Sequence, residues 1–236
     1  MNLILLEPEN LLSESRALLS GIHHHHVVDV LKAKVGDTLK VGLLDGQKGL
    51  ATIQHIGLTD TAIEYLVDQQ PPKKLPLHII LALPRPKVIR RILRSCAEFG
   101  VSEITLLNSY KVEKSYWQSP QLQPSKVHRH FLDGLEQSGD TILPALNVEP
   151  RFKPFAEDRL PNIVQGKNAF VCHPYVNTAM PVLGNKQSVI AIGPEGGFTK
   201  YELEKLQEAG MQAVSIGDRI LRSENALIKA ISSSSP

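Results

Sequence analysis

Two short loops in the last quarter of the chain carry residue types that a ligand site requires. The first loop, Gly193-Pro-Glu-Gly-Gly197, directly follows the apolar run Val189 to Ile192. Glycines let backbone amides approach a ligand closely, and the proline stiffens the turn. Ligands of open α/β sheets bind at such carboxyl ends of strands. This turn alone does not establish a site, because many glycine-rich turns connect a strand to a helix and bind nothing.

The second loop runs from Ile216 to Ala226 and is expected to open the last helix at Ser223. Arg222 has a planar donor fork that suits either a phosphate or a developing anion. Glu224 is a candidate proton acceptor. A structural role stays open, in which Glu224 faces the helix dipole and Ser223 caps the helix. The first loop lacks the lysine that ends a phosphate-binding loop, and the loops hold no metal-binding carboxylate pair, which argues against a nucleotide-hydrolysing enzyme.

The chain from residue 71 onward alternates strands and helices, which predicts an α/β domain with a mainly parallel sheet and helices on both faces. Pro86 suits a first helical position, and Thr199 with Glu202 three residues later forms a capping box. The expected strands cover residues 77–83, 103–108, 169–173, 188–193 and 213–217.

Residues 1–70 show short β-rich runs separated by turn signals, the pattern of a small barrel. Asp45-Gly46 predicts a tight hairpin turn, and one short helix is expected over residues 25–32. The polar, proline-bearing segment 69–74 cannot continue a strand ladder, so we place the boundary between domains 1–70 and 71–236 there. The expected strands cover residues 3–6, 38–44, 50–56 and 61–67.

The composition is that of an ordinary globular protein, with 42% hydrophobic and 21% charged residues. No segment approaches the roughly 20 apolar residues that a membrane helix requires, so we expect a cytoplasmic protein without a membrane partner. Cys96 and Cys172 lie in apolar runs and are expected to be buried thiols. Four adjacent histidines, His23 to His26, cannot all face one ion, so no metal is expected.

Basic residues concentrate on one predicted helix, although the net charge is only +2. The spacing of Lys87, Arg90, Arg91 and Arg94 places them on one helical face without acidic partners in that helix. A solvated face is the simpler interpretation, but an all-basic face is unusual, and we interpret it as an RNA backbone track.

The two loops together resemble the SPOUT superfamily, and specifically the ribosomal RNA small subunit methyltransferase E family. The residues that carry the resemblance are Gly193-Pro-Glu-Gly-Gly197 paired with Leu221-Arg-Ser-Glu-Asn-Ala226. Supporting similarity extends over nearly the whole chain and includes the segment from Lys87 to Val101, Glu136-Gln-Ser-Gly139, and His26 with Val30-Leu31 before Val35-Gly-Asp37.

The resemblance implies a trefoil-knotted SPOUT sheet, a PUA-like RNA-binding barrel in front of it, and a homodimer. It further implies methylation of a uridine at ring nitrogen 3 in 16S rRNA, with S-adenosylmethionine as cofactor and 16S rRNA or the 30S subunit as partner. Arg222 and Glu224 would be catalytic, and His26, Lys87, Arg90, Arg91 and Arg94 would bind RNA. The cofactor would contact Val171, His173, Pro174, Gly193, Pro194, Glu195, Gly196, Gly197, Ile216, Gly217, Ile220, Leu221 and Ser223.

Methyl transfer to a uracil nitrogen requires removal of its proton, so one loop carboxylate must act as the base. We favour Glu224 over Glu195, with Asp218 as the third carboxylate in the loops. Tyr116 and Trp117 could stack a base extruded from its helix, but an aromatic pair belongs more often to a core or a dimer interface, which we favour.

Three features depart from the family pattern. Ser223-Glu-Asn225 stands where Thr-Glu-Thr is usual, Asp140 replaces an arginine, and the chain ends soon after Ile231, so a shortened last helix is expected. Asp140 and Asn225 support the alternative functions, an RNA-binding protein of this fold without methyltransferase activity, or a methyltransferase with a different RNA target.

Overall fold

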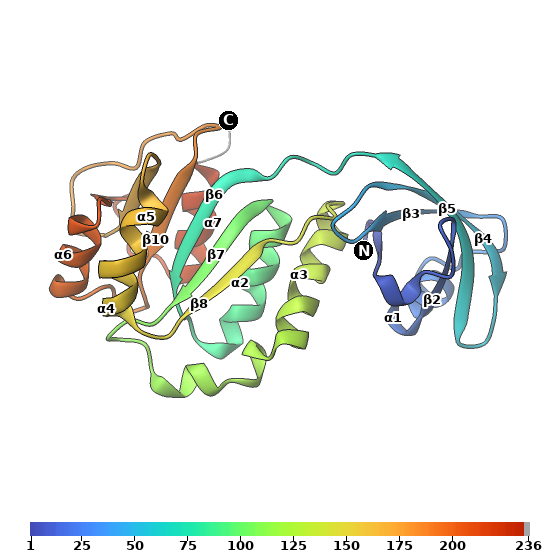
Figure 1. Cartoon of the computed structure of the whole chain (residues 1–236). Helices are drawn as coiled ribbons and strands as arrows, with labels where there is room; N and C mark the ends of the chain where they lie inside the picture. The colour runs from blue at the N-terminus through green and yellow to red at the C-terminus, as the bar shows by residue number, and fades with distance from the viewer. Residues whose placement is uncertain (234–236) are drawn as a thin grey trace. The chain divides into compact units, whose positions relative to one another are not determined.

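The computed structural model describes residues 1–233 and consists of two compact units (Figure 1). The first unit comprises Met1–Lys73 and Leu132–Leu143, and the second comprises Lys74–Phe131 with the chain from Pro144 onward. The sequence pattern did not predict that a segment beyond residue 130 belongs with the N-terminal strands.

The first unit is a five-stranded sheet in the order β1-β3-β4-β5-β2. Alternate side chains of its strands, such as Val41, Ile53 and Ile63, form a buried core. Neighbouring strands are antiparallel except for β1 and β3. The five-residue strand β2 was not predicted. The strands are β1 (Ile4–Leu6), β2 (Arg16–Ser20), β3 (Thr38–Leu43), β4 (Lys48–Ile56) and β5 (Asp60–Gln69).

The helix of the first unit begins earlier than expected, as α1 (Gly21–His25), and continues as the π-helical turn η2 (His26–Val30). Adjacent histidines here point to different partners: His23 lies against Glu136, His24 contacts the Thr61 hydroxyl, and His25 pairs with Asp29. Within residues 1–233, no group of three or more His, Cys, Asp or Glu side chains is placed to hold a metal ion.

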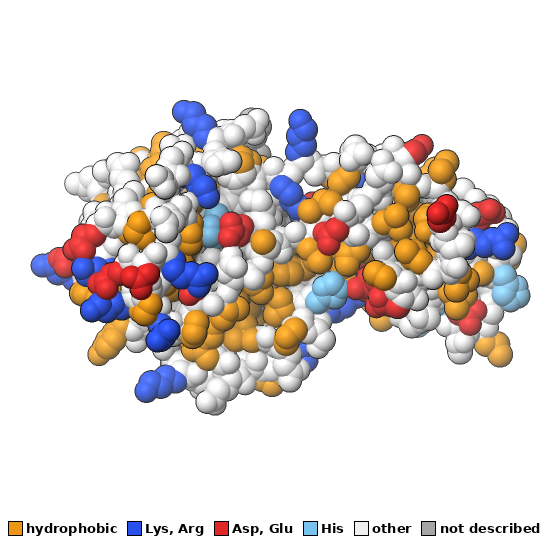
Figure 2. All heavy atoms as spheres, in the orientation of Figure 1, with side chains coloured by type: hydrophobic (Ala, Val, Ile, Leu, Met, Phe, Trp, Pro, Cys, Tyr) orange, Lys and Arg blue, Asp and Glu red, His pale blue; other side chains and the backbone are white. Residues whose placement is uncertain are grey.

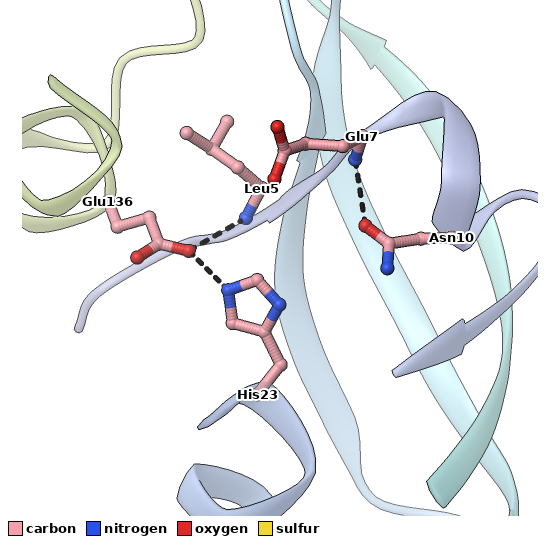
Figure 3. Close-up of polar contacts among 5 residues, drawn as sticks. All are labelled: Leu5, Glu7, Asn10, His23 and Glu136. Atoms are coloured by element: carbon pink, nitrogen blue, oxygen red, sulfur yellow. Dashed lines mark hydrogen bonds and ion pairs between the residues drawn. The ribbon is translucent and has the colours of Figure 1, made fainter. Parts of the chain in front are cut away.

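Glu136 fastens the end of helix α3 (Pro124–Ser138) to the first strand and helix of the first unit (Figure 3). Its side chain is only 1% exposed. The carboxylate lies 2.6 Å from His23 Nε2 and accepts a hydrogen bond from the Leu5 amide at 3.4 Å. Its carbonyl oxygen accepts from the amides of Asn2 and Leu3. The family signature Glu136-Gln-Ser-Gly139 therefore has a structural function in this unit.

Asp140, which replaces an arginine of the family pattern, is 3% exposed and turned inward. Its Oδ1 accepts hydrogen bonds from the amides of Thr141 and Ile142, at 2.7 and 3.1 Å, and so closes the turn after α3. Asp45, at the predicted hairpin turn, has a positive φ of 57° and accepts from the Leu143 amide. Asp140 thus shapes the backbone of the first unit.

The second unit contains a fully parallel six-stranded sheet in the order β11-β9-β10-β6-β7-β8. All five expected strands are present within a few residues, and β8 was not predicted because its residues are only partly buried. The strands are β6 (Leu75–Ala82), β7 (Val101–Leu107), β8 (Ala145–Glu149), β9 (Asn168–Cys172), β10 (Ser188–Ile192) and β11 (Gln212–Val214).

Helices cover both faces of this sheet (Figure 1). Helices α2 (Pro86–Glu98) and α7 (Ser223–Ser232) pack together on one face, and α5 (Leu160–Val164) lies over β10 on the other. The predicted first helical position of Pro86 and the Thr199–Glu202 capping box of α6 (Lys200–Glu208) are confirmed. The remaining short helices are η1 (Pro8–Asn10), η3 (Lys114–Gln118), η4 (Pro120–Leu122), α4 (Phe152–Pro154) and η5 (Phe155–Arg159).

Charged side chains of both signs gather over α4 and α6 on the face shown in Figure 2. These charges are paired with one another, for example Lys205 with Glu157 and Glu208. No helix of residues 1–233 combines the length and apolarity needed to cross a membrane.

Replacing Glu136 with alanine is expected to destabilise the first unit by about 1–3 kcal/mol, because the buried His23 ring and the Leu5 amide lose their acceptor. The shift in urea midpoint, followed by circular dichroism, measures this effect. Glu9→Ala, at an exposed position of the same unit, is the control. Equal midpoints for the two variants would show that Glu136 does not fasten α3.

Candidate active site

A small cavity of about 100 Å³ lies at the carboxyl ends of β9, β10 and β11, and we call it the loop cavity. Parallel strands end at the same sheet edge, so the loops that follow these three strands meet there. The loops contribute His173 and Pro174, the Gly193–Gly197 turn, and the segment after Ile216. The predicted cofactor residues that line the cavity are His173, Pro174, Gly193, Pro194, Glu195, Gly197, Ile216, Gly217, Ile220, Leu221 and Ser223.

Two predicted cofactor residues lie outside the lining of the loop cavity. Val171 is fully buried in β9, and the carbonyl of Gly196 accepts a hydrogen bond from Lys111 Nζ at 2.6 Å. The sequence pattern missed several lining residues, namely Cys172, Ile192, Phe198, Arg219 and Ala226. The first four lie next to a predicted residue, and Ala226 lies one helical turn after Ser223.

The backbone of this cavity depends on glycine at two turns. Gly197 has a φ of 70° and Gly217 a φ of 128°. Both values lie in a region where a side chain is strained. The amides and carbonyls of these turns consequently reach the cavity without a side chain in front of them.

A second cavity of about 890 Å³ adjoins the first, and we call it the cation cavity. Glu195, Ile220, Leu221 and Ser223 line both cavities. Arg222 and Glu224, the two predicted catalytic residues, lie in the cation cavity and not in the loop cavity. The Ile216–Ala226 segment therefore borders both cavities, with Arg222 and Glu224 in the cation cavity alone.

Ser223 does not cap the last helix. It is the first helical residue of α7 and is buried, while Arg222 occupies the capping position without a side-chain capping bond. The predicted alternative, in which Ser223 is only a helix cap, is wrong. Asn225, the departure from the family pattern, is exposed at a separate hollow between α2 and α7 and lines neither cavity.

Two arginines hold the loop carboxylates at the cation cavity. Arg85 Nε lies 2.8 Å from Glu195, and an Arg91 guanidinium nitrogen donates to Glu224 at 2.8 Å. These pairs join α2 and the residue before it to both ligand loops. The pairs are partly exposed, so their main effect is on geometry and not on stability.

The expectation that the basic face lacks acidic partners in its own helix is wrong for Arg94, and Arg91 has an acidic partner in another helix. Arg91 pairs with Glu224, and Arg94 donates to Glu98 one turn later in the same helix, at 2.9 Å. Lys87 is exposed at the edge of the cation cavity. Arg90 is also exposed and has interactions of its own.

The adjacent aromatic residues Tyr116 and Trp117 separate in the structure. Tyr116 lines the cation cavity, and burial together with its hydrogen bond to Glu113 raises the pKa of its hydroxyl. Trp117 Nε1 donates to Asn108 Oδ1 at 2.9 Å. The Tyr116 ring therefore lies at the candidate site, while the Trp117 ring is bonded to the segment that follows β7.

Two histidines named by the sequence pattern are held in sheltered positions. Burial lowers the pKa of His173 in the loop cavity, where its Nδ1 accepts from the Tyr175 amide. Burial, followed by the positive N-terminus, lowers the pKa of His26. His26 belongs to the first unit and lies near Met1 and Glu136, so both rings favour the neutral form at neutral pH.

Comparison with known proteins identifies the family of this chain. Residues 71–235 match the family model described as an RNA methyltransferase domain. Ribosomal RNA small subunit methyltransferase E of Treponema pallidum is 30% identical over 240 residues, covering 98% of this chain and 89% of that protein. The chain belongs to the ribosomal RNA small subunit methyltransferase E family.

Other members of the methyltransferase E family agree with this assignment. The protein of Synechocystis is 30% identical over 233 residues, covering 94% of this chain and 73% of its own length. A crystal structure of the enzyme from Neisseria gonorrhoeae bound to S-adenosyl methionine superposes with a TM-score of 0.73 at 21% identity, over 98% of this chain and 95% of that one. This second similarity concerns the fold.

Both cysteines are expected to resist thiol reagents at pH 8 in the native protein, because burial raises the pKa of Cys96 and of Cys172 to about 12. The reactive thiolate is then scarce. Colorimetric thiol titration measures the rate, and in guanidinium chloride both thiols should react rapidly. Fast labelling of Cys172 in the native protein would contradict the prediction and would show that this thiol is accessible and ionised.

Proposed function

We propose that this protein methylates a uridine of 16S rRNA at ring nitrogen 3, with S-adenosylmethionine bound in the loop cavity. The observation that carries the proposal is the junction of two cavities along one segment: Ser223 lines both cavities, and its neighbour Arg222 lines the cation cavity alone. Such a junction brings a methyl donor and an acceptor base together while keeping their binding surfaces separate.

The residues of the loop cavity fit this cofactor. Ile192, Phe198, Ile220 and Leu221 offer apolar walls for an adenine ring, and the Gly197 and Gly217 turns offer backbone hydrogen-bonding groups. When bound, S-adenosylmethionine supplies an electrophilic methyl group on a sulfonium. Burial raises the pKa of the Cys172 thiol to about 12, which disfavours a covalent intermediate on this cysteine and agrees with direct transfer to RNA.

We also infer that the second unit is a SPOUT trefoil knot. The His173 amide bonds to Val214 on one side of β11, while Ser215 exchanges backbone bonds with Thr178 and Met180. Residues 179 and 215 form an additional parallel bridge. The connection from β9 to β10 thus passes around the end of β11, as threading of the following chain through a loop would require.

The acceptor uracil would occupy the cation cavity. Glu224 would accept the proton from ring nitrogen 3, and Arg91 would hold that carboxylate in place. Arg222 would stabilise the negative charge that develops on the uracil oxygens. Tyr116 offers an aromatic face for an extruded base in the same cavity.

The remaining features of the family apply to this chain as parts of the same proposal. The first unit would be a PUA-like barrel that helps to hold RNA, with His26 at its surface, and Lys87, Arg90, Arg91 and Arg94 would follow the phosphate backbone. The protein would act as a homodimer in the cytoplasm. Asp140 and Asn225 give no support to an inactive protein, because neither lines the two cavities.

Wild-type protein is expected to transfer a tritiated methyl group from S-adenosylmethionine to 30S subunits lacking the modification, with the label recovered as 3-methyluridine. Arg222→Ala should lower kcat by about 100- to 1,000-fold, the effect of removing one anion-stabilising donor. Lys126→Ala, an exposed cation on α3 outside both cavities, should match wild type. Cofactor binding without transfer to this RNA would indicate a different RNA target, and absence of cofactor binding would indicate an inactive RNA-binding protein.

Substituting each of the two loop carboxylates in turn tests which one accepts the proton from the uracil. Glu224→Gln should lower kcat at saturating substrates, because the amide cannot accept the uracil proton. Glu195→Gln should mainly raise the KM for the cofactor, because Glu195, which borders both cavities, reaches the proposed cofactor site, whereas Glu224 does not. Single-turnover methyl transfer measures both effects, and the opposite pattern would assign the base to Glu195.

Substitutions on the basic face of α2 are expected to change the salt dependence of RNA binding to different extents. Lys87→Ala should reduce the slope of log affinity against log salt by about 0.7–0.9, the value for one lost phosphate contact. Arg94→Ala should change it less, because Arg94 is engaged with Glu98. Filter binding of rRNA fragments at several salt concentrations measures the slopes, and equal responses to both substitutions would contradict this order.

A further inference from the structure

A third cavity, of about 490 Å³, lies between the chain after β7 and the starts of α4 and α6, and we call it the tyrosine cavity. Asn108, Ser109 and Tyr110 form one wall, immediately after β7. Phe152 and Lys153 at the start of α4 form a second wall, and Tyr201 at the start of α6 forms a third. It shares no lining residue with the loop cavity or the cation cavity.

Two tyrosine rings stand exposed at this cavity on a rigid backbone. Tyr110 is 85% exposed and Tyr201 is 47% exposed. The buried Glu202 carboxylate fixes both segments, because it accepts from the Tyr110 amide at 2.7 Å and from the Thr199 amide and hydroxyl at 2.8 and 2.9 Å. An exposed aromatic ring on a fixed backbone provides contact area at a low entropic cost of ordering.

The cavity wall also contains a polar group without a partner. Ser109 is 2% exposed, and its hydroxyl makes no hydrogen bond in the structure. Leaving a buried hydroxyl unsatisfied is costly for the fold, and such a group is usually explained by a ligand or by function. The neighbouring Asn108 accepts a hydrogen bond from Trp117 through its Oδ1, so its side-chain NH2 group points away from Trp117.

We propose that the tyrosine cavity binds a second, unstacked nucleotide of the RNA substrate. Aromatic faces that stack a base, hydroxyl and amide groups that read its edge, and a lysine for its phosphate are the groups by which proteins hold single-stranded RNA. Tyr110 and Tyr201 supply the faces, Ser109 and Asn108 the polar groups, and Lys153 the cation. The inference rests on the proposed function to the extent that it takes RNA as the substrate.

The position of this cavity connects it to the candidate active site. Lys111, next to Tyr110, donates to the carbonyl of Gly196 in the ligand turn. Phe152 of the tyrosine cavity contacts Phe198 of the loop cavity, with ring centroids 6.5 Å apart. Both contacts involve the Gly193–Phe198 segment, whose Glu195 lines the cation cavity. A nucleotide held in the tyrosine cavity would therefore suit a neighbour of the acceptor base in the same RNA strand and would add recognition of sequence or shape beside the methylated residue.

The test is binding of a short single-stranded oligouridylate to the full chain, followed by the fluorescence of Trp117, the only tryptophan. Trp117 reports on the cavity because it donates to Asn108. Tyr110→Ala and Tyr201→Ala should each weaken binding by about 5- to 100-fold, the effect of removing one stacking ring. Phe99→Ala, an aromatic ring 43% exposed at the end of α2, is the control and should bind as wild type. Tyr110→Phe should retain binding because the stacking face remains.

Methyl transfer separates this inference from the proposed function. If both are correct, Tyr110→Ala raises the KM for RNA and leaves kcat and cofactor affinity unchanged. If wild-type protein methylates 30S subunits but Tyr110→Ala and Tyr201→Ala behave as wild type in binding and in KM, the tyrosine cavity is not a nucleotide site. Tyrosine-dependent binding by a protein that transfers no methyl group would support the cavity and overturn the proposed function instead.

Discussion

The candidate site depends on one topological constraint, the ending of three parallel strands side by side at one edge of the sheet. β9, β10 and β11 follow one another in the chain, but in the sheet β11 and β10 lie on opposite sides of β9. Their following loops must therefore meet, and the cavity between them is lined by residues more than fifty positions apart. His173, Gly193 and Ile220 lie around the same space for this reason.

Electrostatic pairs then set the shape of the neighbouring cavity. Arg85 and Arg91 reach from the start of α2 to Glu195 and Glu224, one in each ligand loop. Exposed pairs of this kind contribute little to stability, so their consequence is orientation. The pairs also distinguish the basic residues from one another. An arginine that is paired with a loop carboxylate is less available to a phosphate than the exposed Lys87 is.

Carboxylates also hold segments together in the first unit, but there they are buried and bind backbone amides. The carboxylate of Glu136 lies against the His23 ring, and its carbonyl oxygen accepts hydrogen bonds from amides at the start of the chain. Asp140 accepts from the Thr141 amide and closes the turn that follows. From the sequence alone, the replacement of an arginine by Asp140 supports the alternative functions. Its burial shows instead that this position supports the backbone, so a charge reversal in a motif does not by itself argue for lost function.

The sequence by itself determined the α/β class, most strands, the helix starts at Pro86 and Thr199, and the two loops that line the loop cavity. These features are local, since hydrophobic periodicity and capping residues act over a few neighbouring positions. Strands β2 and β8 escaped prediction because they are short and partly exposed, and the pairing of Arg91 with Glu224 escaped because it joins residues 133 positions apart. Only the tertiary structure decided that the end of α3 completes the first unit, that Ser223 lines both cavities while Arg222 lines the cation cavity alone, and that Tyr110 and Tyr201 border one space. Each of these depends on which segments the sheet order and the buried hydrogen bonds bring together, and adjacent residues in the chain do not encode that information.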